Sequence, residues 1–255
     1  MSAVNGSASS GLRLVTRDGE VLGGRWWEAA RSEGAAVVLV HGFTGSKDEP
    51  SVVATAEAIS AAGHDVLAYD ARGHRGSSGQ CTLGDLERLD VAAAVDAARD
   101  RADRIVLVGA SMGAIAVLRH AADEPHLAGV VSVSSPSRWR LPRTGRTVLA
   151  TALTRTSVGR RVAARYMDVR LAPRWTNPEP PEALAARITV PLAIVHGTED
   201  RFVLPREAEE LALAAGGRCR LHLVPKMGHA FDRVATPAVL SAIEWVLASE
   251  PSPAR

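Results

Sequence analysis

The sequence predicts an α/β protein built on a doubly wound, mostly parallel β-sheet. Short apolar runs such as residues 35–40 and 105–108 are continuous rather than alternating, which is typical of strands buried on both faces. Segments with helical spacing of apolar residues lie between these runs, and strands that alternate with helices form parallel sheets. The 255-residue chain is 46% hydrophobic, which is enough for one large domain with a full core.

The first half of the chain begins with a predicted β-hairpin at the edge of the sheet. Residues 12–15 and 21–27 flank Arg17-Asp18-Gly19, a turn signal between alternating segments. The elements expected next are a strand at 35–40, a helix at 49–62, a strand at 64–69 and a helix at 83–101. We expect that last helix to bury one face, formed by Leu86, Leu89, Ala93 and Ala97.

The second half continues the alternation of strands and helices. The apolar run 105–108 leads into small and apolar residues at helical spacing, up to residue 121. The later elements are expected as strands at 129–134, 190–196 and 219–224, with helices at 206–215 and 237–248. In a sheet of this kind ligands bind at the carboxyl ends of the strands, so the functional residues are expected in the loops that follow them.

The composition argues against several classes of protein. The net charge is only +2, so the chain as a whole does not suggest a nucleic-acid-binding protein. Cys81 and Cys219 lie far apart and without the spacing of metal ligands, so neither a disulfide framework nor a metal site is expected. No apolar run approaches the roughly 18 residues of a membrane span. Residues 1–11 are polar and lack the regions of a signal peptide, so we expect a disordered leader on a cytoplasmic protein.

Residues 137–188 differ in composition from the rest of the chain. Eleven arginines outweigh three acidic residues there, so the segment carries eight net positive charges. Two short amphipathic helices are predicted, with arginines facing solvent: Val148, Leu149, Ala152 and Leu153 mark the first, and Val158, Val162 and Tyr166 the second. We therefore expect a single domain over residues 12–250, with a cap inserted at about 137–188 and a tail at 251–255.

The run 105–108 continues directly into Gly109-Ala110-Ser111-Met112-Gly113 and then into the predicted helix. Strand, Gly-x-Ser-x-Gly and helix in this order predict a nucleophile elbow, a turn so sharp that Ser111 must adopt strained backbone angles. Gly109 and Gly113 are required because a side chain at either position would collide with the neighbouring strand or helix. The alternative is an ordinary strand-to-helix turn in which the serine caps the helix.

Two further candidates for the chemistry, Asp200 and His229, each follow a predicted strand. A serine hydroxyl needs an adjacent imidazole to accept its proton, and that imidazole needs a carboxylate to hold its tautomer. The order Ser111, Asp200, His229 fits such a triad, although a lone His229 would more often be structural. Glu199 adjoins Asp200 and is the reserve for the acid. Three other aspartates are more typical of helices or turns: Asp65, Asp70 and Asp85.

Acyl transfer also needs hydrogen-bond donors aimed at the developing oxyanion. The backbone N–H of Met112, at the start of the elbow helix, is one candidate. The second is expected after the strand 35–40, in His41-Gly42-Phe43, where Phe43 would offer its N–H while its ring lines the pocket. Taken alone, His-Gly-Phe is more typical of a tight turn around a structural histidine, and it is the elbow that favours the oxyanion hole.

Five segments together, HGFTGSK, YDARGHRGSSG, GASMGA, HGTEDRFV and MGHAF, resemble the α/β-hydrolase superfamily. Within it the chain is similar to compact bacterial serine esterases, including cinnamoyl and feruloyl esterases, and to serine aminopeptidase-like hydrolases. The resemblance covers nearly the whole chain and implies the α/β-hydrolase fold with a small helical cap. It also implies the following roles: Ser111 as nucleophile, His229 as general base, Asp200 as orienting acid, and Phe43 with Met112 as oxyanion-hole donors. One departure is Arg75, which separates His74 from Gly76 where relatives usually read Gly-His-Gly-x-Ser, and this concerns the shape of the pocket.

We expect the chain to hydrolyse a small-molecule ester of a small or medium acyl group through an acyl-enzyme, without a metal or an organic cofactor. A thioesterase or peptidase with the same triad is the alternative among enzymes, and a noncatalytic ligand-binding protein on this fold is the alternative of another class. Four arginines favour an anionic substrate or an acidic carrier unless they are simply solvated: Arg138, Arg140, Arg143 and Arg146. Four residues are expected either to line an acyl pocket or to pack the cap onto the core: Trp139, Tyr166, Met167 and Trp175.

Overall fold

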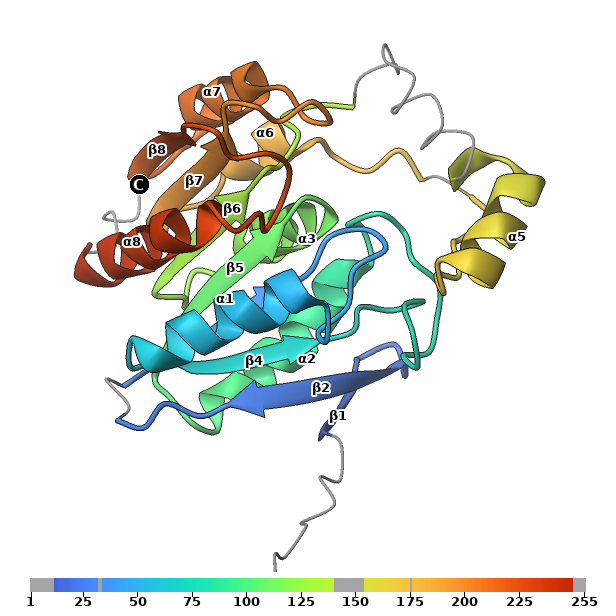
Figure 1. The fold of residues 1–255 in the computed structure, drawn as a ribbon, viewed down its shortest axis with the longest axis horizontal. Coiled ribbons are helices and arrows are strands. Elements are labelled where there is room, and N and C mark those ends of the chain that lie inside the picture. Colours follow the sequence, from blue (N-terminus) through green and yellow to red (C-terminus); the bar gives the residue numbers. More distant parts are fainter. Residues whose placement is uncertain (1–11, 32–33, 140–153, 175, 250–255) are drawn as a thin grey trace, which may run out of the picture.

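The fold is an eight-stranded sheet with helices on both faces (Figure 1), seen in a computed structural model that describes residues 12–31, 34–139, 154–174 and 176–249. The strands lie in the order β1-β2-β4-β3-β5-β6-β7-β8 across the sheet. They span Leu12–Val15 (β1), Val21–Trp27 (β2), Ala35–Val40 (β3), Asp65–Tyr69 (β4), Arg104–Ala110 (β5), Gly129–Val133 (β6), Leu192–Gly197 (β7) and Cys219–Val224 (β8). The predicted doubly wound, mostly parallel sheet is therefore confirmed.

The direction of the strands brings the candidate loops together. Strand β2 pairs antiparallel with both β1 and β4, which confirms the hairpin predicted at the edge of the sheet. The remaining neighbours, from β4 through β8, all pair in parallel. Because parallel strands end on the same edge of a sheet, the loops after β3, β5, β6, β7 and β8 all leave from one edge.

Most of the described helices lie in one layer on each face of the sheet. They span Pro50–Ala61 (α1), Glu87–Arg99 (α2), Met112–Ala121 (α3), Ser157–Tyr166 (α5), Pro181–Ala185 (α6), Pro205–Ala214 (α7) and Ala235–Ala248 (α8). Helices α1 and α8 cover one face, whereas α2, α3, α6 and α7 cover the other (Figure 1). Within the part of the chain that the structure describes, none of these helices is long and apolar enough to span a membrane.

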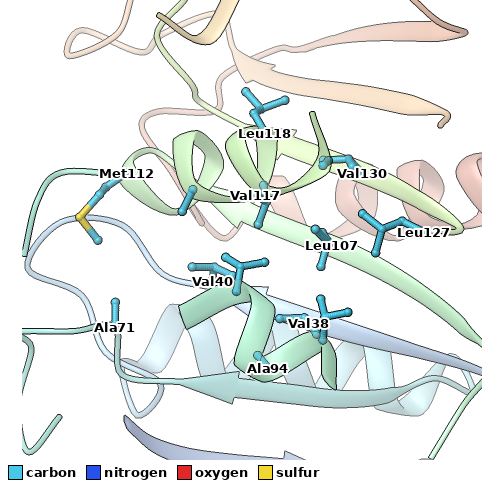
Figure 2. Close-up of a cluster of buried hydrophobic side chains, with 14 of the residues drawn as sticks. Val38, Val40, Ala71, Ala94, Leu107, Met112, Val117, Leu118, Leu127 and Val130 are labelled. Carbon is cyan, nitrogen blue, oxygen red and sulfur yellow. The ribbon is translucent and has the colours of Figure 1, made fainter. Parts of the chain in front are cut away.

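Burial on both faces explains why the strands are apolar without alternation. Successive side chains of a strand point to opposite faces. In β3, Val38 and Val40 accordingly join the core under α2 and α3, while Leu39 joins the core under α1 and α8. Figure 2 shows the first of these clusters, where the β3 side chains lie close to Leu107 of β5 and Val117 of α3.

The buried face of α2 differs from the one predicted. The helix buries Glu87, Asp90, Val91, Ala92, Ala94, Val95 and Ala98, whereas Leu86, Leu89, Ala93 and Ala97 are only half-buried. The carboxylates can be buried because they are paired: Asp90 accepts hydrogen bonds from the N–H and the Nε of Arg72, both at 2.8 Å, and Glu87 accepts one from the N–H of Gly84 at 2.9 Å. The helix also begins later than predicted, since φ is +60° at Leu83 and +98° at Gly84.

The structure describes part of the predicted cap. Helix α5 occupies the place of the second predicted helix, but the predicted apolar face is wrong: Val158 and Tyr166 are 65% and 77% exposed, whereas Gly159 and Ala163 are buried. Ala163 joins the core under α2 and α3, while α5 as a whole stands apart from the sheet in Figure 1. The first predicted helix, near 148–153, lies outside the described residues, as do the expected leader and tail.

The segment after α5 is attached to the loop that follows β4. Val169 and Leu171 form isolated β-bridges with His74 and Cys81. Between them, Arg170 donates its N–H to the carbonyl of Gly73 at 2.7 Å, and its own carbonyl accepts the N–H of Cys81 at 2.7 Å. These backbone bonds hold the segment after α5 against the loop that carries Arg75.

Candidate active site

Strand β5 turns into helix α3 at Ser111, which has φ +53° and ψ −112°, a strained conformation for a residue with a side chain. A Cβ on Gly109 would lie 2.4 Å from the carbonyl oxygen of Gly113, and a Cβ on Gly113 would lie 2.4 Å from that of Val40. Both contacts are far inside van der Waals distance, so glycine is needed at the two positions. The hydroxyl of Ser111 makes no capping bond to α3, which argues against the alternative of a simple helix cap.

The hydroxyl of Ser111 lies instead beside His229, which comes from the loop after β8. The distance from Ser111 Oγ to His229 Nε2 is 3.0 Å, and His229 Nδ1 lies 2.7 Å from Asp200 Oδ2. A carboxylate can only accept a hydrogen bond, so the proton is on Nδ1. The lone pair of Nε2 therefore faces the serine hydroxyl, the orientation that a general base requires.

Asp200 is buried, at 2% exposure, and its carboxylate is surrounded by donors. Oδ1 accepts hydrogen bonds from the N–H of Phe202 at 2.8 Å and the N–H of Val203 at 2.9 Å, while Oδ2 accepts the bond from His229. Burial by itself would raise the pKa of Asp200, but His229 and these two N–H groups lower the pKa below its usual value. The carboxylate is therefore ionised at neutral pH.

The other candidates for the acid lie elsewhere. Glu199 is exposed and makes no side-chain hydrogen bond within the described residues. Asp65 accepts the N–H of Ala29, Asp70 accepts from Lys47, and Asp85 faces Arg88. The structure thus brings Asp200, and not Glu199, to His229.

The peptide between Gly42 and Phe43 lies beside the nucleophile. A Cβ placed on Gly42 would lie 3.4 Å from the Cβ of Ser111. The Gly42 carbonyl accepts the N–H of Gly45 at 3.0 Å and the Nδ1–H of His41 at 2.8 Å. In a planar trans peptide the N–H points opposite to the carbonyl, so the N–H of Phe43 points away from these two donors. In the described chain neither this N–H nor that of Met112 has a hydrogen-bond partner, so both can bind an oxyanion.

The loop that carries Phe43 is braced by the end of β4. His41 accepts the N–H of Ala71 at its Nε2, at 3.0 Å. Asp70 accepts both the N–H and the Nζ of Lys47, at 2.8 and 2.9 Å. Burial lowers the pKa of His41 to about 3, an effect to which the neighbouring ring of His74 adds. His41 is therefore neutral and fixed in one tautomer, which holds the Gly42 carbonyl in place.

Arg75, the departure from the usual pattern, has a left-handed backbone. Its φ is +48°, a conformation that favours glycine. The N–H of Arg75 donates to the carbonyl of Asp168 at 3.0 Å, and its carbonyl accepts from the guanidinium of Arg170 at 3.3 Å. Arg75 thus lies where the loop after β4 meets the segment after α5.

Three side chains that were not predicted from the sequence lie close to Asp200 or to the loop that carries His229. His196 donates its Nε2–H to the carbonyl of Val203 at 2.9 Å, and Nε2 lies 3.5 Å from Asp200 Oδ2. Asp232 accepts the N–H of Gly228 at 3.0 Å, next to His229. The ring of Phe202 lies 5.1 Å from the ring of His229. Their nearness to Asp200 and His229 in sequence is the only signal, and the loop conformations decide which of them make contact.

The cap residues are only partly described. Arg138 forms an ion pair with Glu182, so the charge predicted to attract an anion is already matched by a carboxylate. Trp139 donates its Nε1–H to the carbonyl of Pro178 at 2.6 Å, and Met167 packs on the core under α2 and α3. Four of the predicted cap residues lie outside the described residues: Arg140, Arg143, Arg146 and Trp175.

In the described ranges no three histidine, cysteine, aspartate or glutamate side chains are arranged to hold a metal ion. Both cysteines are free thiols, and Cys81 is buried with its Sγ 3.5 Å from the Sδ of Met112.

Comparison with known proteins agrees with this fold. A model of the alpha/beta hydrolase family matches residues 37–242. No curated protein sequence matches the chain. Among solved structures, the esterase Pf2001 of Pyrococcus furiosus is 23% identical with a TM-score of 0.73, over 93% of this chain and 89% of its own. Est1E from Butyrivibrio proteoclasticus, solved with ferulic acid bound, is 20% identical with a TM-score of 0.68, over 93% of this chain and 100% of its own. XC6422 from Xanthomonas campestris, a serine hydrolase without a lid, is 19% identical with a TM-score of 0.64, over 98% of this chain and 100% of its own.

Proposed function

The chain belongs to the alpha/beta hydrolase family, and from this membership we propose that it is a serine hydrolase that cleaves carboxylic esters of small or medium acyl groups. The observation that carries the proposal is the continuous hydrogen-bonded chain from Ser111 through His229 to Asp200. A serine at a strained turn has no structural need for an imidazole and a buried carboxylate in line with its hydroxyl. Acyl transfer does need them.

In the proposed reaction Ser111 is the nucleophile. His229 Nε2 accepts the hydroxyl proton while Ser111 Oγ attacks the carbonyl carbon, and Asp200 stabilises the imidazolium that forms. The tetrahedral intermediate collapses by breaking the bond between the carbonyl carbon and the alcohol oxygen, and His229 gives its proton to the departing alcohol. Water then attacks the acyl-enzyme with His229 again as base, and the carboxylic acid leaves with Ser111 restored.

The oxyanion of each intermediate is proposed to bind the N–H groups of Phe43 and Met112. The Phe43 donor is supported by its fixed peptide, whose carbonyl is held on the other side by His41 and Gly45. A preorganised donor of this kind contributes about 10²–10³-fold to kcat. The Met112 donor is supported by its position as the first residue of α3, where an N–H has no acceptor within the helix.

We propose esters rather than thioesters or amides as the substrates because two of the structural relatives point to esters. Pf2001 is an esterase, and Est1E binds ferulic acid. Esters of hydroxycinnamic and short aliphatic acids are therefore the first substrates to test. Thioesters and aminoacyl amides are the comparison, since the same triad can cleave them.

The test is labelling by a fluorophosphonate probe together with turnover of a panel of chromogenic esters, thioesters and aminoacyl amides. We expect the wild-type protein to be labelled at Ser111 and to turn over one or more esters fastest. The Ser111→Ala variant should lose labelling and nearly all turnover while keeping its circular dichroism spectrum. A wild-type protein that is neither labelled nor active on any member of the panel would support the noncatalytic binding protein instead.

A further inference from the structure

The end of strand β6 lies between the nucleophile and the base. The carbonyl of Val133, the last residue of β6, accepts the N–H of Ser111 at 2.9 Å. The next residue, Ser134, is fully buried, and its Oγ accepts the N–H of Ala230 at 3.1 Å. Val133 therefore holds the backbone N–H of the candidate nucleophile, Ser111. The next residue, Ser134, holds the N–H of Ala230, which follows the candidate base, His229.

The backbone of Ser134 is itself held in an unusual conformation. Its φ is +51°, in the left-handed region that favours glycine, although the residue carries a side chain. Its N–H donates to the carbonyl of Val195 at 3.0 Å, which ties it to strand β7. A strained residue persists only where the surrounding structure holds it, and such residues gather at functional sites. From this position the hydroxyl of Ser134 reaches the loop after β8, where it accepts the N–H of Ala230.

The loop that carries His229 is fixed on both sides of that residue. On one side Asp232 accepts the N–H of Gly228 at 3.0 Å. On the other side Ala230 has φ +62°, and its N–H is the group that Ser134 holds. The peptide that joins His229 to Ala230 therefore depends on Ser134 for its orientation, and the direction of the imidazole follows from that peptide.

We propose that Ser134 is a positioning residue that sets the distance between Ser111 Oγ and His229 Nε2. The inference rests on the proposed function, in which this pair transfers the proton. Ser134 acts through Ala230 and His229 and is buried, so it contacts no substrate. Its loss should lower kcat and leave KM unchanged, because it changes proton transfer and not binding.

The test compares Ser134→Ala, Ser134→Gly and a matched control, Ser132→Ala. Ser132 lies two residues earlier on β6 and is also fully buried, but its hydroxyl has no hydrogen-bond partner among the residues that the structure describes. We expect both Ser134 variants to lose about 10-fold in kcat and in the rate of fluorophosphonate labelling, and the control to keep both. Glycine relieves the left-handed strain whereas alanine keeps it, so equal losses assign the effect to the hydroxyl.

A second readout separates this inference from the proposed function. The proton that His229 Nδ1 shares with Asp200 gives a low-field resonance in the proton NMR spectrum, which requires no substrate. We expect this resonance to broaden or shift in both Ser134 variants and to stay unchanged in Ser132→Ala. If the wild-type protein cleaves no ester and the resonance still changes, the positioning role stands and the esterase proposal fails. If both Ser134 variants keep the wild-type kcat, labelling rate and resonance, the inference is overturned.

Discussion

The strain at Ser111 predicts that glycine at this position gives a more stable protein than alanine does. With φ +53° and ψ −112° the residue lies in a backbone region that is unstrained only for glycine. For any other residue this backbone strain costs about 1–3 kcal/mol of stability. Ser111→Ala removes the hydroxyl but keeps the Cβ and the strain. Ser111→Gly removes both, while losing about 0.5–1 kcal/mol to the greater freedom of glycine in the unfolded chain. We therefore expect Ser111→Gly to be more stable than Ser111→Ala by about 1 kcal/mol.

The difference between these two variants in the free energy of unfolding reports the backbone strain at position 111. Both lose the bond from Ser111 Oγ to His229, so that contribution cancels. The free energy of unfolding is measured by urea titration at pH 7 and followed by circular dichroism, and Tm should differ by about 2–4 °C for a chain of this size. Both variants should also lose turnover by about 10⁴-fold or more. The reasoning is refuted if Ser111→Ala proves as stable as Ser111→Gly, because the turn would then store no strain.

Three further predictions concern the acid, the buried histidine and the cap. Asp200→Asn should lower kcat by about 10⁴-fold on the best ester, whereas the exposed Glu199→Gln should keep most of the activity; a reversed ranking would move the acid to Glu199. Because burial lowers the pKa of His41 to about 3, the unfolded chain binds a proton there below about pH 6.5 that the folded chain does not, so stability falls as pH falls. Between pH 6.5 and pH 5 this amounts to about 2 kcal/mol in urea unfolding, and His41→Gln should flatten the dependence; an unchanged slope would show that His41 does not contribute. Because Arg138 is already paired with Glu182, removing both charges together with Arg138→Gln and Glu182→Gln should leave the salt dependence of kcat/KM for a carboxylate-bearing ester unchanged, and a weakened dependence would restore the role of Arg138 in steering.

Much of the fold and the site could be predicted because the deciding signals are local. A strand buried on both faces is apolar at every position. The apolar run at Ala35–Val40 therefore predicts a strand in a parallel sheet with helices on both faces. The elbow is also marked by a local pattern, Gly-x-Ser-x-Gly between a strand and a helix, and Gly109 is required by a contact within that turn. Once parallel strands are recognised, their carboxyl ends share one edge, which explains why Ser111, Asp200 and His229 could be predicted to meet.

The tertiary structure decided the features that depend on partners far away in the sequence. The buried face of α2 could not be predicted from its leucines, because Asp90 is buried through its bonds to Arg72 and not through apolarity. The face that α5 exposes depends likewise on what packs beside it. These choices arise from the pairing of groups that the chain brings together only on folding.

Glu199 and Asp200, two neighbouring residues, show the same difference between what the sequence predicts and what the tertiary structure decides. Both are carboxylates after strand β7, and their intrinsic chemistry is nearly the same. The sequence by itself determined that an acid follows this strand, at the edge where the nucleophile lies. The turn that follows β7 decided which acid it is, since the N–H groups of Phe202 and Val203 hold the Asp200 carboxylate inward against His229 and leave Glu199 in solvent. A buried carboxylate is stable only where donors surround it, and only the folded loop supplies them.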